Sequence, residues 1–322
     1  MSLQKAFKDL LSDDEGDSLF LKAKEENPWF SESEVKLSLQ AWINALQPEK
    51  IQKWVPVVQP KNSKTIGLIL AGNIPLVGLH DVLSVIVSGH KLRIKLSSND
   101  SILMNFAIDT LIRESHNLKS RIELSSDMKG IDAIIATGSS NTSRYFDYYF
   151  AHLPKIIRRN RHSVAVLTGK ETEEDLNKLC EDIFSFFGLG CRSVSKLLVP
   201  KEYDFTRLFE ASERFRTRIA SNIRFANNLD YNLALFMVNK EKFLTNNLFI
   251  LQKNNALGSP IGVVHYEEYG DSKEITSHLI NLENAIQCLV GHGFDVPFGK
   301  SQYPELTDYA DGINTLKFLA KL

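Results

Sequence analysis

From Lys64 to about residue 153 the chain alternates short apolar runs with amphipathic runs, and this alternation constrains the fold more than any other feature. The apolar run KTIGLIL is followed by the helical pattern LVGLHDVLSVIVSG and then by a second apolar run, HKLRIKL. Strand, helix, strand units of this kind pair in parallel through right-handed crossovers. The pattern therefore predicts an α/β fold, with an open, mostly parallel sheet covered by helices on both faces.

Open parallel sheets bind ligands at the carboxyl ends of their strands, which here are AGNIP, KLSSND and ATGSS. The amide of Asn73 could donate to an oxyanion there, or it could simply mimic a backbone turn. Lys95 could bind ribose or phosphate, or it could reach solvent. Gly138 and Ser139 precede a predicted helix, where they could bind a pyrophosphate or cap the helix.

The rest of the chain divides into recognisable segments. Residues 1 to 60 are predicted to be helical, with a capping box of Ser31 and Glu34 at the start of SESEVKLSLQAWINAL. A second α/β unit spans 161 to 290, and its clearest predicted strands are ALFMV and IGVVHYEEY. A tail from 291 to 322, rich in turn formers, is expected to return to the core.

Cys191 stands out among the three cysteines because Gly188 and Gly190 precede it in FGLGCRSVSKLLVP. A buried thiol needs no glycines around it, so this pattern suggests a sulfur that a substrate approaches. A thiolate becomes a good nucleophile beside a cation, and Arg192 is adjacent in sequence. Cys180 and Cys288 lie in apolar patterns that predict helices, so they are interpreted as core thiols.

Composition excludes several classes of function. The 38 basic and 39 acidic side chains argue against a nucleic-acid binder and favour a small-molecule partner. The sequence has no C-x-x-C pair and no H-E-x-x-H motif, so no metal is expected. No run is apolar enough to span a membrane, and the acidic first residues do not read as a signal peptide, which predicts a cytoplasmic protein.

In order and spacing, these features resemble the aldehyde dehydrogenase superfamily, and within it the acyl-CoA reductases that supply fatty aldehyde to luciferase. AGNIPLVGLHDVLSVIVSGHKLRIKLSSND is similar to the family's P-W-N-F-P to K-P-S-E block, and IATGSS to its F-T-G-S turn. FGLGCRSVSKLLVP resembles the nucleophile segment, and FGKSQYPELTDYADG the reductases' C-terminal Q-x-P and D-G pattern. The resemblance implies two open-sheet domains with the active site between them.

The resemblance also implies a role for each motif residue. Cys191 would be the nucleophile, and its backbone N–H would form an oxyanion hole with Asn73. Lys95 and Ser98 would lie at the adenosine ribose, and Gly138 with Ser139 at the pyrophosphate. Residues 61 to 160 would bind the dinucleotide, and 161 to 290 would be the catalytic domain.

Two departures from the family pattern refine this reading. Aldehyde oxidisers carry a glutamate base before the cysteine, whereas the corresponding stretch here, RNRHSVAVLTG, has none. His162 lies near this gap and could assist proton transfer, or it could be a surface histidine. The family's ribose-binding glutamate is replaced by Ser98, which removes repulsion of a 2′-phosphate and favours NADPH, with NADH as the alternative.

These observations predict reduction of an acyl thioester, such as a fatty acyl-CoA, to the aldehyde by NADPH through an acyl-enzyme on Cys191. Three alternatives stay open: an acyl-phosphate reductase, an aldehyde dehydrogenase of the same fold, and a non-catalytic scaffold or complex subunit. Homo-oligomers are compatible with the sequence but are not predicted by it.

Overall fold

A computed structural model describes residues 2–55, 62–138, 140–271, 275, 279 and 285–322. The chain forms two compact units. The first contains residues 1–160 and 303–322, and the second contains 161–302. The second unit is therefore continuous in sequence, whereas the first is built from two separate stretches.

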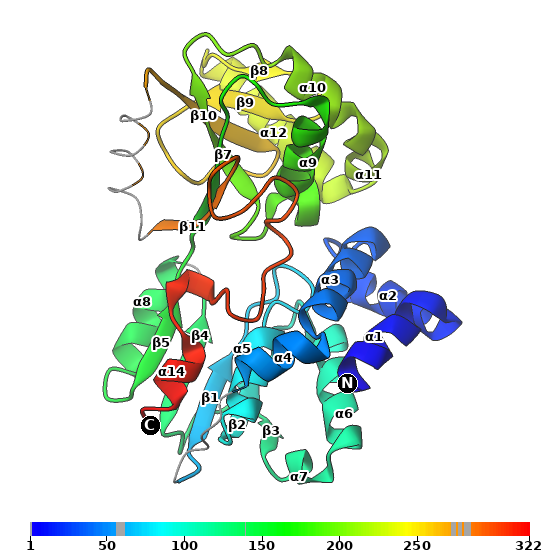
Figure 1. Cartoon of the computed structure of the whole chain (residues 1–322), viewed down its shortest axis with the longest axis vertical. Coiled ribbons are helices and arrows are strands. Elements are labelled where there is room, and N and C mark those ends of the chain that lie inside the picture. Colours follow the sequence, from blue (N-terminus) through cyan, green and yellow to red (C-terminus); the bar gives the residue numbers. More distant parts are fainter. Residues whose placement is uncertain (1, 56–61, 139, 272–274, 276–278, 280–284) are drawn as a thin grey trace. The chain divides into compact units, whose positions relative to one another are not determined.

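The sheet of the first unit is parallel throughout, with the strand order β3-β2-β1-β4-β5 (Figure 1). Its strands are β1 Thr65–Ile69, β2 Lys91–Lys95, β3 Ile122–Leu124, β4 Ala133–Thr137 and β5 Lys155–Arg158. The chain moves outward from β1 to β3 and then crosses back to β4 on the other side of β1. This reversal is the topological switch at which open sheets bind ligands.

Alternate residues of these strands face two different hydrophobic layers. Ile66, Leu68 and Ile135 pack on one side, in a core shared with the helices that follow β1 and β2. Ile134 and Ala136 pack on the other side with aromatic residues of the helix that follows β4. The predicted sheet with both faces covered is therefore confirmed. The connecting helices are α5 Leu79–Val87, α6 Ser101–Glu114, α7 His116–Lys119 and α8 Ser140–Tyr149.

The predicted helical N-terminal segment is also present. Its helices are α1 Ser2–Ser12, α2 Asp14–Glu26, α3 Glu32–Ala45 and α4 Pro48–Trp54. Helix α3 begins where expected, but the capping box at its start is wrong, because the Ser31 side chain makes no capping hydrogen bond and contacts Ser33 instead. The structure places a capping box at Thr172 and Asp175, on a helix of the second unit.

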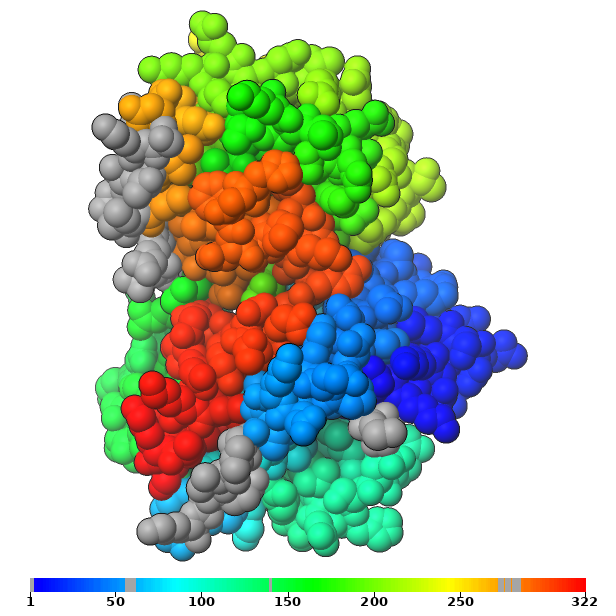
Figure 2. Space-filling model, viewed as in Figure 1, coloured from blue at the N-terminus to red at the C-terminus, as the bar shows by residue number. Residues whose placement is uncertain are grey.

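Residues 303–322 complete the first unit. They include the 3₁₀ turn η4 Ala310–Gly312 and helix α14 Thr315–Leu319. The imidazole of buried His90 contacts the Leu319 carbonyl at 3.1 Å, and Lys50 pairs with Glu305 at 2.8 Å. Figure 2 shows these red residues alongside the light-blue surface of the N-terminal segment.

The second unit contains a six-stranded sheet with the order β11-β6-β7-β10-β9-β8 (Figure 1). Only the short strand β8 pairs antiparallel among these strands. The strands are β6 His162–Val166, β7 Val194–Pro200, β8 Leu244–Thr245, β9 Ile250–Lys253, β10 Val263–Tyr269 and β11 Ile286–Val290. The helical elements that the structure describes in residues 161–271 are α9 Glu173–Phe184, η1 Ser185–Gly188, α10 Thr206–Ser212, η2 Glu213–Phe215, α11 Arg216–Ala220 and α12 Ile223–Val238.

Two local predictions in this unit are wrong. ALFMV is the last part of α12 and not a strand, and Met237 and Val238 in it are 65% and 79% exposed. A short apolar run does not distinguish strand from helix by periodicity, and the N-cap that starts this helix, Asn222, lies twelve residues upstream of the run. Cys288 is a core thiol as expected, but it lies in strand β11 and not in a helix.

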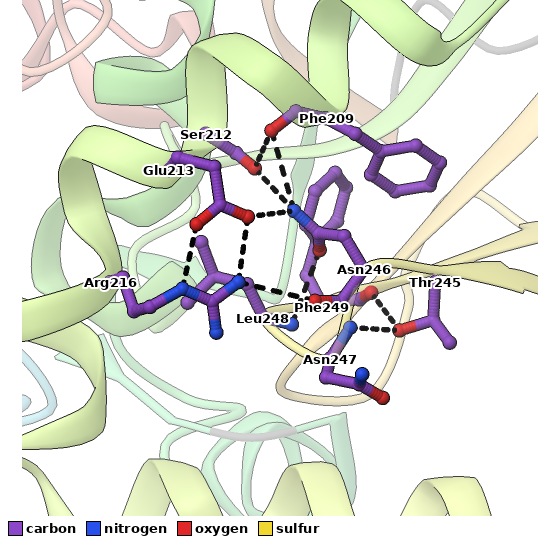
Figure 3. Close-up of polar contacts among 9 residues, drawn as sticks. All are labelled: Phe209, Ser212, Glu213, Arg216, Thr245, Asn246, Asn247, Leu248 and Phe249. Carbon is purple, nitrogen blue, oxygen red and sulfur yellow. Dashed lines mark hydrogen bonds and ion pairs between the residues drawn. The ribbon is translucent and has the colours of Figure 1, made fainter.

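A polar cluster joins the β8–β9 connection to helices α10 and α11 (Figure 3). At its centre, Asn246 Oδ1 accepts the Leu248 N–H at 3.2 Å. The Asn246 amide nitrogen donates to three acceptors: the Phe209 carbonyl, Ser212 Oγ and Glu213 Oε1. Glu213 also forms a two-bond pair with Arg216, each bond 2.6 Å long. One side chain thus connects the edge of the sheet to the helices.

Replacing Asn246 with alanine is expected to destabilise the protein by about 1–3 kcal/mol, because the buried Leu248 N–H would lose its acceptor. Asn239→Ala is the matched control, since its exposed amide contacts only Glu241 among the hydrogen bonds seen, and a change within about 0.5 kcal/mol is expected. Urea denaturation measures both. Equal losses in the two variants would contradict the role given to Asn246.

Candidate active site

The candidate residues of the first unit lie at the carboxyl edge of its sheet. Asn73 follows β1, Lys95 ends β2 with Ser98 three residues later, and Gly138 follows β4. Because β1 pairs with β2 on one side and β4 on the other, the structure brings these four residues to one edge. Ser139 lies outside the described residues. The cofactor residues that the resemblance implies, apart from Ser139, therefore share the switch point of the sheet.

The Asn73 side chain is exposed in the loop between β1 and α5. This loop packs closely on the loop that follows β2: a Cβ atom at Gly72 would lie 2.5 Å from Ser97 Oγ, so only glycine fits. Leu76 has the left-handed φ of +58°, and its N–H donates to the carboxylate of buried Asp100 at 2.8 Å. Asn73 is thus carried by a loop with a fixed backbone.

The other residues at this edge differ in how closely their neighbours surround them. Lys95 and Ser98 are exposed, although the Lys95 carbonyl accepts the Leu70 N–H at 3.1 Å. At Gly138, a Cβ atom would lie 3.1 Å from the Thr142 side chain and 3.0 Å from the Phe146 ring. The chain therefore turns into α8 with little room for a larger residue at 138. A cation and a hydroxyl reach solvent beside a tight glycine turn, which is an arrangement that suits a phosphate-containing ligand.

The candidate nucleophile, Cys191, lies in the second unit, in an exposed turn that precedes β7. Within this turn the Ser193 N–H donates to the Gly190 carbonyl at 3.0 Å. Ser163, on the neighbouring strand β6, donates its hydroxyl to the Cys191 carbonyl at 2.9 Å. The thiol therefore sits at the amino end of two paired strands, with its own backbone held from the side.

Left-handed backbone precedes this turn. Phe186, Phe187 and Gly188 have φ values of +53°, +54° and +76° in succession, and both phenylalanines are buried. A left-handed conformation costs an ordinary residue about 1–2 kcal/mol, so the packed rings must stabilise it. Gly188 is thus required by the backbone conformation. The approach of a substrate to the sulfur, which the glycine pattern suggested, is not needed to explain Gly188.

Arg192 does contact a sulfur, but that sulfur belongs to Cys288. Its Nη1 donates to Cys288 Sγ at 3.3 Å and to the Ser301 carbonyl at 3.5 Å. The Gln302 amide donates to Ser193 Oγ at 3.2 Å. The sequence did not predict these contacts, which hold the turn that carries Cys191. The one sequence feature that pointed to them was the tail motif that contains Gln302.

Buried Asp182 of α9 holds the same tail segment. Its two carboxylate oxygens accept the N–H groups of Gly299 at 2.7 Å and Ser301 at 3.0 Å. Burial raises its pKa to about 6, and these hydrogen bonds oppose the rise only in part. Asp182 therefore connects α9 to the segment that contacts Arg192.

His162 is half-buried, between the two alternatives of a buried proton carrier and a surface histidine. Its ring lies so close to Gly258 that a Cβ atom there would be 2.4 Å from Cε1, and burial lowers the pKa of the imidazole. Lys196, on the neighbouring strand β7, is fully buried, and its ammonium group binds Glu267 at 2.6 Å and the carbonyls of Asn254 and Asn255. These groups hold the loop after β9 in place.

The described residues include no group of three or more His, Cys, Asp or Glu side chains arranged to hold a metal ion. No helix within them is long and apolar enough to cross a membrane.

No protein-family model matches the sequence, and no curated protein matches it. Solved structures do share its fold. An NAD-dependent aldehyde dehydrogenase from Sinorhizobium meliloti aligns with a TM-score of 0.66 and 12% identity, over 89% of this chain and 68% of its own. An indole-3-acetaldehyde dehydrogenase of P. syringae, in complex with NAD+, aligns with a TM-score of 0.64 and 13% identity, over 90% of this chain and 70% of its own. An NADP-dependent enzyme of E. coli aligns with a TM-score of 0.62 and 10% identity, over 90% of this chain and 72% of its own.

At such low identity, these similarities establish the fold alone. The chain has an aldehyde dehydrogenase-like α/β fold, which confirms the predicted fold class.

Asp182 is expected to make stability depend on pH. Because its pKa rises from 3.8 to about 6 on folding, the folded protein binds the proton more tightly, and stability should fall by about 3 kcal/mol as the pH rises from about 4 to 6. Urea denaturation across this range should show the decline relative to Asp182→Asn, which has no carboxyl to titrate. Parallel curves for the two proteins would refute the assignment.

Proposed function

We propose that the protein reduces an acyl thioester, of the fatty acyl-CoA kind, to the aldehyde with NADPH, through an acyl group bound to Cys191. The observation that carries this proposal is the exposed Cys191 thiol, in a braced turn at the amino end of β7, in an aldehyde dehydrogenase-like fold. An exposed thiol also suits a reducing compartment, so we infer a cytoplasmic protein.

The placement of acidic residues favours reduction over oxidation. Hydrolysis of the acyl group would need a base to activate water, and the segment from Arg159 to Lys170 contains no acid. The next acid is Glu171, beyond the carboxyl end of β6, whereas Ser163 at the amino end is the residue that contacts Cys191. Ser163 and the carboxyl end of β6 are separated by about 10 Å at the usual rise per residue. Glu171 itself is buried and accepts N–H groups from Thr168 and Gly169.

In the proposed cycle, the Cys191 thiolate attacks the thioester carbonyl, and the bond from carbon to the CoA sulfur breaks. CoA leaves as a thiol once it gains a proton, and the acyl group remains on Cys191. Asn73 and the Cys191 N–H would donate to the oxyanion at each tetrahedral stage. The final collapse breaks the carbon to Cys191 sulfur bond and releases the aldehyde.

The first unit has residues that fit a nicotinamide dinucleotide. Lys95 and Ser98 would bind the adenosine ribose, and the Gly138 turn would lie at the pyrophosphate, because the chain there is too tight to admit a larger side chain. When bound, the cofactor supplies the hydride that the thioester carbon accepts. Ser98 carries no charge, so it would not repel a 2′-phosphate, which favours NADPH over NADH.

Alkylation tests the state of the thiols. Iodoacetamide is expected to label native protein at Cys191 alone, because Cys180 and Cys288 are 0% and 4% exposed and burial strongly raises the pKa of the Cys180 thiol. Peptide mass spectrometry reads the sites, and labelling in urea should reach all three thiols. Comparable native labelling of Cys180 would contradict the assignment of Cys191 as the accessible nucleophile.

Acyl-CoA-dependent oxidation of NADPH tests the function. Cys191→Ala should abolish turnover, and Asn73→Ala should lower kcat by about 10²-fold through loss of one oxyanion donor. Asn117→Ala is the control, since this exposed asparagine lies in α7, before β3 and away from the carboxyl edge. Acyl phosphate, simple aldehydes and NADH are run in parallel. Normal turnover by Cys191→Ala would refute the proposal. Faster turnover of acyl phosphate or of a simple aldehyde would make that compound the substrate in place of the acyl thioester.

A further inference from the structure

The loop that carries Asn73 is held at three backbone groups by side chains from outside the loop. Asn27 donates its amide to the Gly72 carbonyl at 3.3 Å, and Ser38 donates its hydroxyl to the Pro75 carbonyl at 2.8 Å. Asp100 accepts the Leu76 N–H at 2.8 Å. These three side chains are only 5%, 4% and 0% exposed, so solvent competes little for their hydrogen bonds.

The bond from Leu76 to Asp100 fixes the most unfavourable part of this loop. Leu76 is left-handed, a conformation that a leucine rarely adopts, and its side chain is buried in the core. Its N–H would have to find another acceptor if the loop relaxed. Asp100 provides the acceptor through Oδ2, while Oδ1 has no hydrogen-bond partner among the described residues. The bond to Leu76 is therefore made by Oδ2 alone.

The same support extends to the loop after β2. Besides Gly72, the Asn27 amide donates to the Asn99 carbonyl at 3.2 Å, so it joins the two loops at the carboxyl edge. The adjacent Glu26 accepts the backbone N–H groups of Ser101 and Ile102, at 2.8 and 3.2 Å, at the start of α6. The end of α2 thus orients both loops at once.

We propose that Asp100, together with Asn27 and Ser38, is a positioning residue that sets the direction of the Asn73 amide. The N-terminal helices would thereby support catalysis without touching the substrate. This inference rests on the proposed function, in which Asn73 donates to the oxyanion. Such a donor acts only when it is held in place before the charge develops, and small displacements of it cost large factors in rate.

Asp100→Asn and Asp100→Ala separate positioning from other effects. Asparagine keeps an oxygen acceptor for the Leu76 N–H, so kcat should stay within about 3-fold of wild type, whereas alanine removes the acceptor and should lower kcat by roughly 10- to 10²-fold. The rate of Cys191 alkylation should be the same in both variants. Ser38→Ala, which removes one hydroxyl and little volume, should also lower kcat if Asp100→Ala does not fold.

A double-mutant cycle gives the decisive comparison. If Asp100 acts through Asn73, then kcat of the double variant Asn73→Ala/Asp100→Ala should be no lower than that of Asn73→Ala alone. Multiplied losses would show that Asp100 acts independently of Asn73 and would overturn the inference. An equal loss of kcat in Asp100→Asn and Asp100→Ala would overturn it as well, because the acceptor would then be irrelevant.

Amide hydrogen exchange separates failure of this inference from failure of the proposed function. The Leu76 N–H should exchange at least 10-fold faster in Asp100→Ala than in wild type, and at nearly the wild-type rate in Asp100→Asn. A wild-type protein without turnover on acyl-CoA would refute the proposed function, and exchange would still show whether Asp100 holds the loop. Unchanged protection of Leu76 in Asp100→Ala would refute the positioning.

Discussion

The first unit depends on the hydrogen bonding of its central strand, β1, which pairs in parallel with β2 on one side and with β4 on the other. Parallel pairing places the loops after all three strands at one edge. The strand order reverses at β1, and the helices that follow β1 and β4 therefore lie on opposite faces of the sheet. The loops that lead into these two helices can then separate and leave room for a ligand between them. Asn73, Lys95 and Gly138 owe their common location to these two ladders, although they lie up to 65 residues apart in the chain.

The Asn73 loop of the first unit and the Cys191 turn of the second unit are held rigid in different ways. Buried side chains from other elements hold the Asn73 loop, and the bonds are made to its backbone. At Cys191, the stiffness comes first from the chain itself, through the left-handed run at Phe186 and Phe187, and then from Ser163 on the adjacent strand. Both devices leave an exposed side chain on a fixed backbone, as the proposed roles of Asn73 and Cys191 would require.

Local patterns predicted much of this architecture. Apolar runs such as KTIGLIL gave the position of β1, and the glycine-flanked Cys191 was found in an exposed turn, as its sequence suggested. The Leu76 bond to Asp100 could not be predicted in this way, because it joins residues 24 apart through a conformation that leucine does not favour. Arg192 shows the same limit: adjacency to Cys191 suggested one sulfur, while the folded chain directs its guanidinium to Cys288, 96 residues later. Contacts between residues far apart in the chain depend on tertiary packing, so local sequence patterns do not predict them.

The return of residues 303–322 to the first unit bears on how the chain folds as it is synthesised. The second unit is continuous in sequence, so its core can close once residue 302 has emerged. The first unit still lacks Leu306 and Leu319, which are buried in its core, and the Thr315 hydroxyl and Ala310 carbonyl that accept hydrogen bonds from Arg158. The guanidinium of Arg158 also pairs with buried Asp81. The earlier-made unit would thus be the later one to finish folding, with its core exposed to chaperones until residues 303–322 have been synthesised.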